Sequence, residues 1–272
     1  MTHWQDVIES TLKAWVRKPR LGIITDVDGT LSPIVSRPEA AQVTARNKSL
    51  LTNLLPHCTL VAAVSGRAAA DIHARVGIAG MVYVGNHGLE RWQDGEVVIS
   101  PEVAEHRPAI EAARDELPAL LSGYDEAEVE DKGPTLSLHY RNVADPSAFA
   151  TKLRPLIRNI TEKHNLHLHE GRMVFEIRPP LALNKGTAMR ALVDEFKLDA
   201  AVYLGDDTTD VDAIRAAREL READACYAFG LGVDSEETPS VVIEAADFSV
   251  LGVSGVEDFF DWVLMARSAS SN

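Results

Sequence analysis

Two acids stand close together in the stretch TDVDGTLSPI, residues 25–34, at the end of an apolar segment. Asp26 and Asp28 could form a metal loop, cap a helix or carry out a reaction. A calcium-binding EF-hand would need an acid or amide at a third alternating position and a glycine at the sixth, whereas Thr30 is third and Gly29 comes too early. A helix cap would use only one acid. A DxDGT pattern also arises by chance, so a reacting centre needs partners elsewhere in the chain.

Such partners occur in three later segments. Ser65 and Arg67 follow an apolar run, and Gly66 between them lets backbone N–H groups approach an anion. Lys185 opens a helix, where backbone amides and the helix dipole add to its positive charge. The segment LGDDTTD ends another apolar run with the acids Asp206, Asp207 and Asp210. Each residue alone has a structural explanation, as a turn residue, a surface lysine or a helix-start acid. Their shared placement at strand ends and helix starts favours one site.

Short apolar runs rich in β-branched residues precede these groups: LGIIT, LVAAV, MVYVG and AVYLG. Runs of this kind are typical of parallel strands buried on both faces. Helical segments intervene, such as residues 44–55 and 68–76. The alternation predicts βαβ units and a Rossmann-like, doubly wound parallel sheet in an α/β core. Ligands of such sheets bind beyond the carboxyl ends of the strands, which is where the polar groups fall.

Residues 101–181 follow a different pattern, that of an inserted α+β segment. Two amphipathic helices alternate with two hairpins in the order αββαββ, at residues 109–121, 128–141, 147–164 and 166–179. The expected boundaries are residues 1–100 with 182–272 for the core and 101–181 for the insert. The core is thus interrupted once and completed after the insert.

The strands of the insert have one apolar and one polar face, because side chains at i and i+2 share a face. Leu136 and Leu138 oppose Ser137 and His139, for example. The two helices must cover the apolar face. The polar face carries both signs of charge, and it could be a solvated outer surface or a lid over a hydroxyl-rich ligand. The alternating histidines, residues 167 and 169, are interpreted as surface groups of this face because no third metal ligand is evident.

The 272-residue chain has a formal net charge of −14 at pH 7. Such a surface repels nucleic acids and anionic membranes, so neither is expected as a partner. No window approaches the ~18 uninterrupted apolar residues of a membrane span, and the N-terminal segment carries acids where a signal peptide carries bases. A cytoplasmic location is therefore expected. An amphipathic helix ending before Pro19 could pack on the core or dock a partner.

The motifs DxDGT, SGR, Lys and GDDxxD, in this order, resemble the motif set of the haloacid dehalogenase (HAD) superfamily of phosphatases. The αββαββ insert resembles the type IIB cap of that superfamily. More narrowly, DVDGTLSPI, GNHGLE, EDKGPTLSLHYR, FEIRP, NKG and LGDDTTD resemble landmarks of the trehalose-6-phosphate phosphatase family, over about residues 20–265. Val27 and Asp131 depart from that family's pattern, which commonly has an aromatic residue or leucine at the first position and a small or neutral residue at the second.

The resemblance implies that Asp26 attacks phosphorus and forms an aspartyl-phosphate. Asp28 would protonate the leaving oxygen and later take a proton from water. A carboxylate about 4 Å from a phosphate charge costs roughly 4 kcal/mol at an effective dielectric near 20, so the attack needs a counter-charge, and Mg²⁺ is the expected cofactor. The implied metal ligands are Asp26, the backbone carbonyl of Asp28, Asp206 and Asp207. The implied phosphate-binding residues are Gly29, Thr30, Ser65, Gly66 and Lys185, with Asp210 orienting the acids.

The resemblance also makes the insert a specificity cap and implies hydrolysis of trehalose 6-phosphate to trehalose and phosphate. The residues assigned to the sugar phosphate substrate are Arg67, His87, Glu130, Lys132, Glu176 and Arg178. A site built to hydrogen-bond hydroxyls strongly rejects ligands that lack them. The alternatives are another sugar phosphate, such as sucrose 6-phosphate or a glucosylglycerate-type ester, and a non-catalytic regulatory module on the same fold. Association with a trehalose-phosphate synthase is a further expectation.

Overall fold

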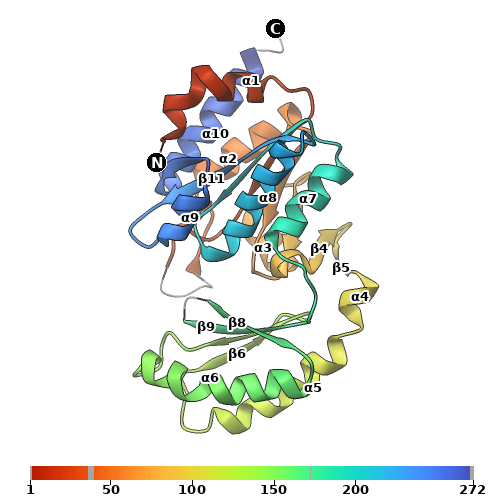
Figure 1. The fold of residues 1–272 in the computed structure, drawn as a ribbon, viewed down its shortest axis with the longest axis vertical. Coiled ribbons are helices and arrows are strands. Elements are labelled where there is room, and N and C mark those ends of the chain that lie inside the picture. Colours follow the sequence, from red (N-terminus) through yellow and green to blue (C-terminus); the bar gives the residue numbers. More distant parts are fainter. Residues whose placement is uncertain (1, 36–39, 172, 270–272) are drawn as a thin grey trace. The chain divides into compact units, whose positions relative to one another are not determined.

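The protein is described by a computed structural model over residues 2–35, 40–171 and 173–269. The chain divides into two compact units (Figure 1). Met1–Val97 and Leu183–Asn272 form the core unit, and Val98–Ala182 form the inserted unit.

In the described part of the chain, eight strands form the large sheet: β1 Leu21–Thr25, β2 Leu60–Val64, β3 Val82–Gly85, β4 Glu90–Gln93, β5 Glu96–Ile99, β10 Ala200–Gly205, β11 Tyr227–Asp234 and β12 Phe248–Leu251. Their order is β12-β11-β10-β1-β2-β3-β4-β5. The strands from β12 to β3 pair in parallel, and β4 pairs antiparallel with β3. Every residue of β1 and β2 is buried, which explains their continuous apolar sequence.

Helices cover both faces of this sheet (Figure 1). One face carries α1 Lys13–Val16, α2 Ala45–Leu54, α3 Ala69–Val76 and α10 Gly252–Ala269. The other carries α7 Lys185–Glu195, α8 Val211–Glu222 and α9 Ser240–Ala245. Single 3₁₀ turns follow α2, β3 and β10, at Leu55–His57, Asn86–Gly88 and Thr208–Asp210. Ile23 packs with the first group and Ile24 with the second, because successive strand residues point to opposite faces.

The N-terminal segment packs on the core unit. It begins with a 3₁₀ turn at Trp4–Val7 and a π-helical turn at Ile8–Leu12, which lead into α1. The Trp4 ring meets the ring of Phe259 in α10 edge-on at a centroid distance of 5.3 Å. The Trp15 indole N–H donates to the Ala201 carbonyl at 3.0 Å. Of the two roles considered for this segment, the structure therefore supports packing.

The inserted unit has its own sheet and core. Its elements are α4 Pro101–Ala104, α5 Arg107–Leu120, β6 Glu128–Asp131, β7 Leu136–His139, α6 Pro146–Lys163, β8 His167–Gly171 and β9 Val174–Arg178. The four strands pair antiparallel in the order β6-β7-β9-β8. Apolar side chains of α5 and α6 pack against Leu136, Leu138 and Phe175. The predicted α/β class, with a doubly wound core and an αββαββ insert, is confirmed.

Four strands of the large sheet lie outside the four apolar runs described above: β4, β5, β11 and β12. β4 and β5 are short, and β5 is exposed throughout, so they lack the apolar run that marks a buried strand. Within the described residues, every helix is too short or too polar to cross a lipid bilayer.

Candidate active site

Two neighbouring strands bring acids from distant parts of the chain together. β1 and β10 are parallel, with Thr25 opposite Leu204. The Asp26 N–H donates to the Leu204 carbonyl at 2.8 Å. Asp26 and Asp206 each follow one of these strands, and both are buried. The strand order reverses around β1, and open α/β sheets bind ligands at such switch points.

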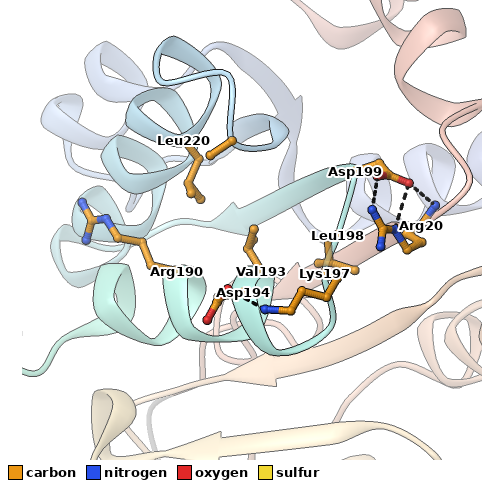
Figure 2. A pocket seen from close by; sticks show the side chains of 9 residues that line it. Arg20, Arg190, Val193, Asp194, Lys197, Leu198, Asp199 and Leu220 are labelled. Carbon is orange, nitrogen blue, oxygen red and sulfur yellow. Dashed lines mark hydrogen bonds and ion pairs between the residues drawn. The ribbon is translucent and has the colours of Figure 1, made fainter.

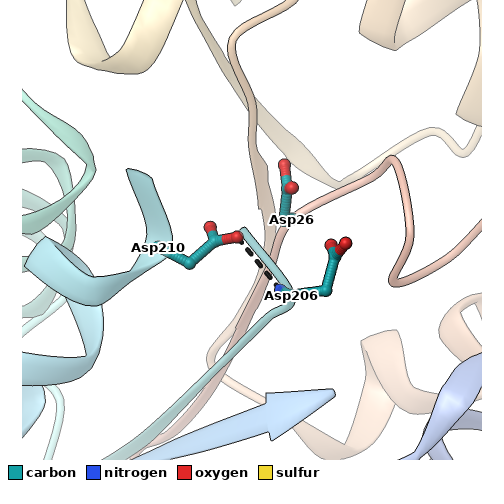
Figure 3. A group of neighbouring side chains, drawn as sticks. All are labelled: Asp26, Asp206 and Asp210. Atoms are coloured by element: carbon teal, nitrogen blue, oxygen red, sulfur yellow. Dashed lines mark hydrogen bonds between the residues drawn. The ribbon is translucent and has the colours of Figure 1, made fainter. Parts of the chain in front are cut away.

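Asp26, Asp206 and Asp210 form what we call the acid cluster (Figure 3). One oxygen of each carboxylate lies within 4.8 Å of the others. Asp210 lies in the turn between β10 and α8, and its Oδ2 accepts the backbone N–H groups of Asp206 at 3.1 Å and Asp207 at 2.9 Å. The Thr30 hydroxyl donates to Asp206 Oδ1 at 3.3 Å. The loop after β10 is thus folded around the Asp210 carboxylate.

Lys185 places a positive charge beside the acid cluster. It is the first residue of α7, whose N-cap is Asn184, and it is buried. Its Nζ lies 3.0 Å from Asp26 Oδ1 and donates to Asp210 Oδ1 at 2.7 Å. The Tyr203 hydroxyl donates to the same Asp210 oxygen at 2.6 Å. Both oxygens of Asp210 are therefore hydrogen-bonded, which suits the orienting role predicted for this residue.

Burial and mutual repulsion set the charges of the acid cluster. Burial raises the pKa of Asp26 to about 7, an effect that Lys185 partly offsets and Asp210 increases. Burial also raises the pKa of Asp206 to about 8, with further contributions from Asp210 and Asp26. Burial alone would lower the pKa of Lys185, but Asp210 and Asp26 outweigh it and raise that pKa above its usual value. The cluster keeps its ammonium charged and still attracts one more positive charge.

A divalent cation fits this donor set. When all three carboxyl groups are ionised, they leave two negative charges against the one ammonium, so a divalent cation that displaces the protons balances the four groups. Carboxylate oxygens are hard ligands, and Mg²⁺ typically uses one or two of them together with water and substrate phosphate. Because both Asp210 oxygens already accept hydrogen bonds, Asp26 and Asp206 keep the greater capacity to bind an ion.

Asp207, a predicted metal ligand, lies beside the acid cluster and not within it. It is half-buried, and its Oδ1 accepts a hydrogen bond from the Thr208 hydroxyl at 3.4 Å. The chain turns at Thr208–Asp210, so Asp210 takes the third place in the cluster.

The loop after β1 turns back at Gly29. Its φ is +77°, and a Cβ at this position would lie 2.1 Å from Asp206 Oδ2, so glycine is needed for both the backbone and the close approach. The Gly29 N–H donates to the Ser32 carbonyl at 2.8 Å. In this structure Gly29 and Thr30 therefore shape the loop and contact Asp206, while their contact with phosphate stays a prediction.

Arg67 is placed against Asp28. Its Nε and Nη2 donate to the two Asp28 oxygens at 2.6 and 2.8 Å, and its Nη1 donates to Asp71 Oδ2 at 2.9 Å. Bidentate pairs of this kind fix the orientation of the carboxylate. The structure thus places Arg67, assigned to substrate from the sequence, where it can position Asp28.

Ser65, Gly66 and His87 meet beyond β2 and β3. The Ser65 hydroxyl oxygen accepts the Arg67 N–H at 3.3 Å, and the Ser65 carbonyl accepts the His87 N–H at 2.9 Å. His87 has a φ of +59°, an uncommon conformation for a residue with a side chain. A Cβ on Gly66 would lie 2.5 Å from His87 Nε2. Only glycine at position 66 lets the two loops approach this closely.

Two buried polar residues beside the site were not predicted. Glu90, the first residue of β4, accepts the Ala69 N–H at the start of α3 at 2.6 Å. Tyr203 in β10 donates to Asp210. The signals that could have identified them are a charged residue two positions after the GNHG turn and one hydroxyl in an otherwise aliphatic strand.

The polar face of the inserted unit is built from strand residues in register. Glu130 in β6 pairs with Ser137 in β7, which pairs with Glu176 in β9, so the three side chains lie in one row. Lys132 Nζ lies 3.8 Å from Glu130 Oε2 and 3.9 Å from Glu176 Oε1. Arg178 donates to Glu176. The structure brings together the four residues of this unit that were assigned to the sugar.

A pocket of about 310 Å³ lies at the other ends of β1 and β10 (Figure 2). Arg20, which lines it, directly precedes β1, and Asp199 directly precedes β10. Arg20 pairs with Asp199 at 2.6 Å, and Lys197 pairs with Asp194 at 2.9 Å. Acids already neutralise these two bases, so they are poorly suited to bind a phosphate ester.

Comparison with known proteins gives a family match. The trehalose-phosphatase family model matches residues 24–250. The chain is 36% identical over 204 residues to a trehalose-phosphate phosphatase of Mycobacterium marinum, an alignment that covers 73% of this chain and 52% of the relative. The chain therefore spans about half the length of this curated relative.

Solved structures share the fold. The C-terminal domain of C. albicans trehalose-6-phosphate phosphatase gives a TM-score of 0.76 at 20% identity and covers 97% of both chains. The C-terminal domain of Candida albicans trehalose synthase regulatory protein gives a TM-score of 0.64 at 13% identity, over 94% of this chain and 96% of that one.

Proposed function

Because the chain belongs to the trehalose-phosphatase family, we propose that it hydrolyses trehalose 6-phosphate to trehalose and phosphate in a Mg²⁺-dependent reaction. The observation that carries the proposal is the buried acid cluster at the carboxyl ends of β1 and β10, with Lys185 against it. Asp28, two residues beyond the nucleophile candidate, adds a second carboxylate with a fixed partner in Arg67.

In the first step, a carboxylate oxygen of Asp26 attacks phosphorus. The new P–O bond to Asp26 forms as the P–O bond to the sugar oxygen breaks, and Asp28 gives its proton to that oxygen. After the transfer, the Asp28 carboxylate is held by the two N–H groups of Arg67. The products of this step are trehalose and a phosphorylated Asp26.

In the second step, water attacks phosphorus while Asp28 accepts one of its protons. The P–O bond to Asp26 breaks, so phosphate is released and both carboxyl groups return to their starting states. The bidentate contact with Arg67 orients the ionised Asp28 as the base of this step.

The charge of the phosphate must be offset for Asp26 to approach it. A bound Mg²⁺ would neutralise part of this charge, held by Asp26, Asp206 and the Asp28 carbonyl. Lys185 keeps its ammonium beside Asp26 and would bind a transferring oxygen, together with Ser65. Both residues are buried, so their hydrogen bonds to phosphate would be little weakened by water.

The polar face of the inserted unit would bind the sugar. Its charged groups lie within 4 Å of one another and can donate to and accept from hydroxyls at the same time. Such a site loses affinity strongly for ligands without hydroxyls, because its buried polar groups would stay unpaired. This face supports a glycosyl substrate over a small aryl ester.

The test is phosphate release from a panel of esters, with and without Mg²⁺. We expect trehalose 6-phosphate to be preferred over sucrose 6-phosphate, a glucosylglycerate-type phosphate and p-nitrophenyl phosphate, and turnover to stop when the metal is chelated. Preference for sucrose 6-phosphate would keep the mechanism and replace the substrate. If the folded chain releases phosphate from none of these esters, the proposal that it is a phosphatase is wrong.

A regulatory module on the same fold is the alternative from another functional class. The complete set of Asp26, Asp28, Ser65, Lys185 and Asp206 argues against it, since a non-catalytic module has no need of a buried, repulsive acid cluster. Association with a trehalose-phosphate synthase and a cytoplasmic location stay predictions, which co-purification and cell fractionation would test.

A further inference from the structure

The turn that carries Lys132 is bound to a helix of the inserted unit by a network of charged groups. Asp131 ends β6 and lies on the opposite face of the strand from Glu130. The two Asp131 oxygens accept from Arg107 Nη1 at 2.8 Å and Nη2 at 2.9 Å. Arg114, two turns further along α5, donates to Asp131 Oδ2 at 3.0 Å.

The same network holds both polar groups of the next turn residue. The Gly133 N–H donates to Asp131 Oδ1 at 2.9 Å, and the Gly133 carbonyl accepts from Arg107 Nη1. Gly133 has a φ of +87°. The Lys132 N–H donates to the Thr135 carbonyl at 3.0 Å. The backbone of Lys132 is therefore fixed from both sides.

This arrangement determines where the Lys132 ammonium lies. The side chain is only 9% exposed, and its Nζ stands between Glu130 and Glu176. A lysine side chain is a flexible stem, so its direction depends on where its Cα is held. A displaced Cα would therefore move the ammonium away from Glu130 and Glu176 and from a sugar bound against them.

We propose that the Arg107–Asp131 pair is a clamp that positions Lys132 and so sets the affinity of the polar face for the sugar. The inference rests on the proposed function. The hydrogen bonds from Arg107 are the main cause that lowers the pKa of Asp131 to about 2, so the pair persists at any ordinary assay pH.

The chain offers a matched control for this clamp. Arg154 in α6 donates to both oxygens of Glu170 in β8, at 2.8 and 3.0 Å. This pair also joins a helix to a strand of the inserted unit, and its side chains are 37% and 39% exposed. Neither α6 nor β8 contributes a residue to the turn that holds Lys132.

The experiment compares Asp131→Ala with Glu170→Ala in the full chain. Asp131→Ala should raise KM for trehalose 6-phosphate about tenfold, leave kcat within about twofold, and leave turnover of p-nitrophenyl phosphate unchanged. Glu170→Ala should change none of these values. If Glu170→Ala reproduces the effect of Asp131→Ala, general loosening of the unit explains it and the clamp is overturned.

A double variant tests whether the effect passes through Lys132. Once Lys132→Ala has raised KM, adding Asp131→Ala should change it by less than about twofold, because coupled residues are not additive. A full tenfold increase on top of Lys132→Ala would overturn the inference. If Lys132→Ala raises KM but Asp131→Ala does not, the inference fails and the proposed function stands. If Lys132→Ala leaves KM unchanged, the sugar-binding role in the proposed function fails as well.

Hydrogen exchange tests the clamp independently of any measurement of turnover. Amides of residues 128–136 should exchange faster in Asp131→Ala than in the parent chain, and Glu170→Ala should leave them unchanged. Unchanged exchange in Asp131→Ala would overturn the clamp even if the chain is an active phosphatase.

Discussion

The acid cluster of the core unit and the polar face of the inserted unit are both charged, but they are built differently. Asp210 in the cluster is fully buried, whereas the Glu130 side chain on the polar face is 49% exposed. The cluster is held by backbone N–H groups and by Gly29, whose positive φ and close packing against Asp206 both require glycine. The polar face is held by long side chains that contact one another across strands.

This difference assigns the chemical reaction to the acid cluster and the selection of the substrate to the polar face. Buried charges interact strongly because little water screens them, so a change in the acid cluster should affect every substrate. Partly exposed ion pairs contribute less to the free energy of unfolding, but their groups can give up one another and hydrogen-bond to sugar hydroxyls. A change in the polar face should therefore depend on which substrate is tested.

Replacing the proposed nucleophile should cause the largest loss of activity in either region. Asp26→Asn should lower kcat by about 10⁴-fold or more for both trehalose 6-phosphate and p-nitrophenyl phosphate, because no carboxylate remains to attack phosphorus. Thermal unfolding should show a folded chain, since asparagine has nearly the same shape. Turnover near that of the parent chain would mean that the nucleophile is another residue.

The next largest effect should come from the glycine that lies against the acid cluster. Gly29→Ala should lower kcat about 10²-fold for both substrates, because its Cβ would displace the Asp206 carboxylate. Gly95→Ala is the control, since Gly95 has a φ of +90° and an added Cβ there would meet open space among the described residues. It should cost about 1 kcal/mol of stability and no activity. Equal activities of the two variants would contradict the steric argument.

The polar face should give a smaller and selective effect. Glu130→Ala should lower kcat/KM for trehalose 6-phosphate about 10- to 100-fold, because a charged hydrogen bond contributes roughly 1.5–3 kcal/mol. Turnover of p-nitrophenyl phosphate should stay within about twofold. Glu128→Ala, on the exposed start of the same strand, serves as the control. Equal losses on both substrates would assign Glu130 a structural role.

The fold could be predicted from the sequence wherever burial leaves a pattern. β1 and β2 are buried on both faces and read as continuous apolar runs, and the inserted strands alternate in sequence because only one of their faces packs against α5 and α6. β5 is exposed along its whole length, so no such pattern marks it. The register of Glu130 with Ser137 follows from pairing between strands, which a single sequence does not encode locally.

The sequence predicts those parts of the site that are placed by the ends of the strands. Acids after β1 and β10 had to meet because the carboxyl ends of neighbouring parallel strands meet. Which acid of the LGDDTTD segment turns inward depends on the loop conformation, and there Asp210 joins the cluster while Asp207 lies beside it. The contact of Arg67 with Asp28 depends on side-chain rotamers and could not be derived.

The smallest expected effect is on the stability of the metal-free chain. The pKa values of Asp26, about 7, and Asp206, about 8, lie above the ordinary value of 3.8. Between about pH 4 and pH 8 the folded chain therefore holds protons that the unfolded chain has released, and its stability should fall as the pH rises through this range. Bound Mg²⁺ replaces those protons, so it should raise Tm more near pH 8.5 than near pH 6. At ten times its Kd the gain is about 1.4 kcal/mol, or about 3 to 5 °C for a chain of this size.

Thermal unfolding of the chelated and the Mg²⁺-loaded chain over this pH range measures the effect. Asp206→Asn removes one of the two groups with a raised pKa and one expected metal ligand. It should flatten the pH dependence of the metal-free chain and reduce the Mg²⁺-induced gain together, because both arise from the same uncompensated charge. A metal-free Tm that rises from pH 5 to pH 8 would contradict the raised pKa values, and an unchanged Mg²⁺ gain in Asp206→Asn would mean that the acid cluster is not the metal site. Glu130→Ala should leave both quantities unchanged, since the polar face is screened by water and lies in a unit with its own core.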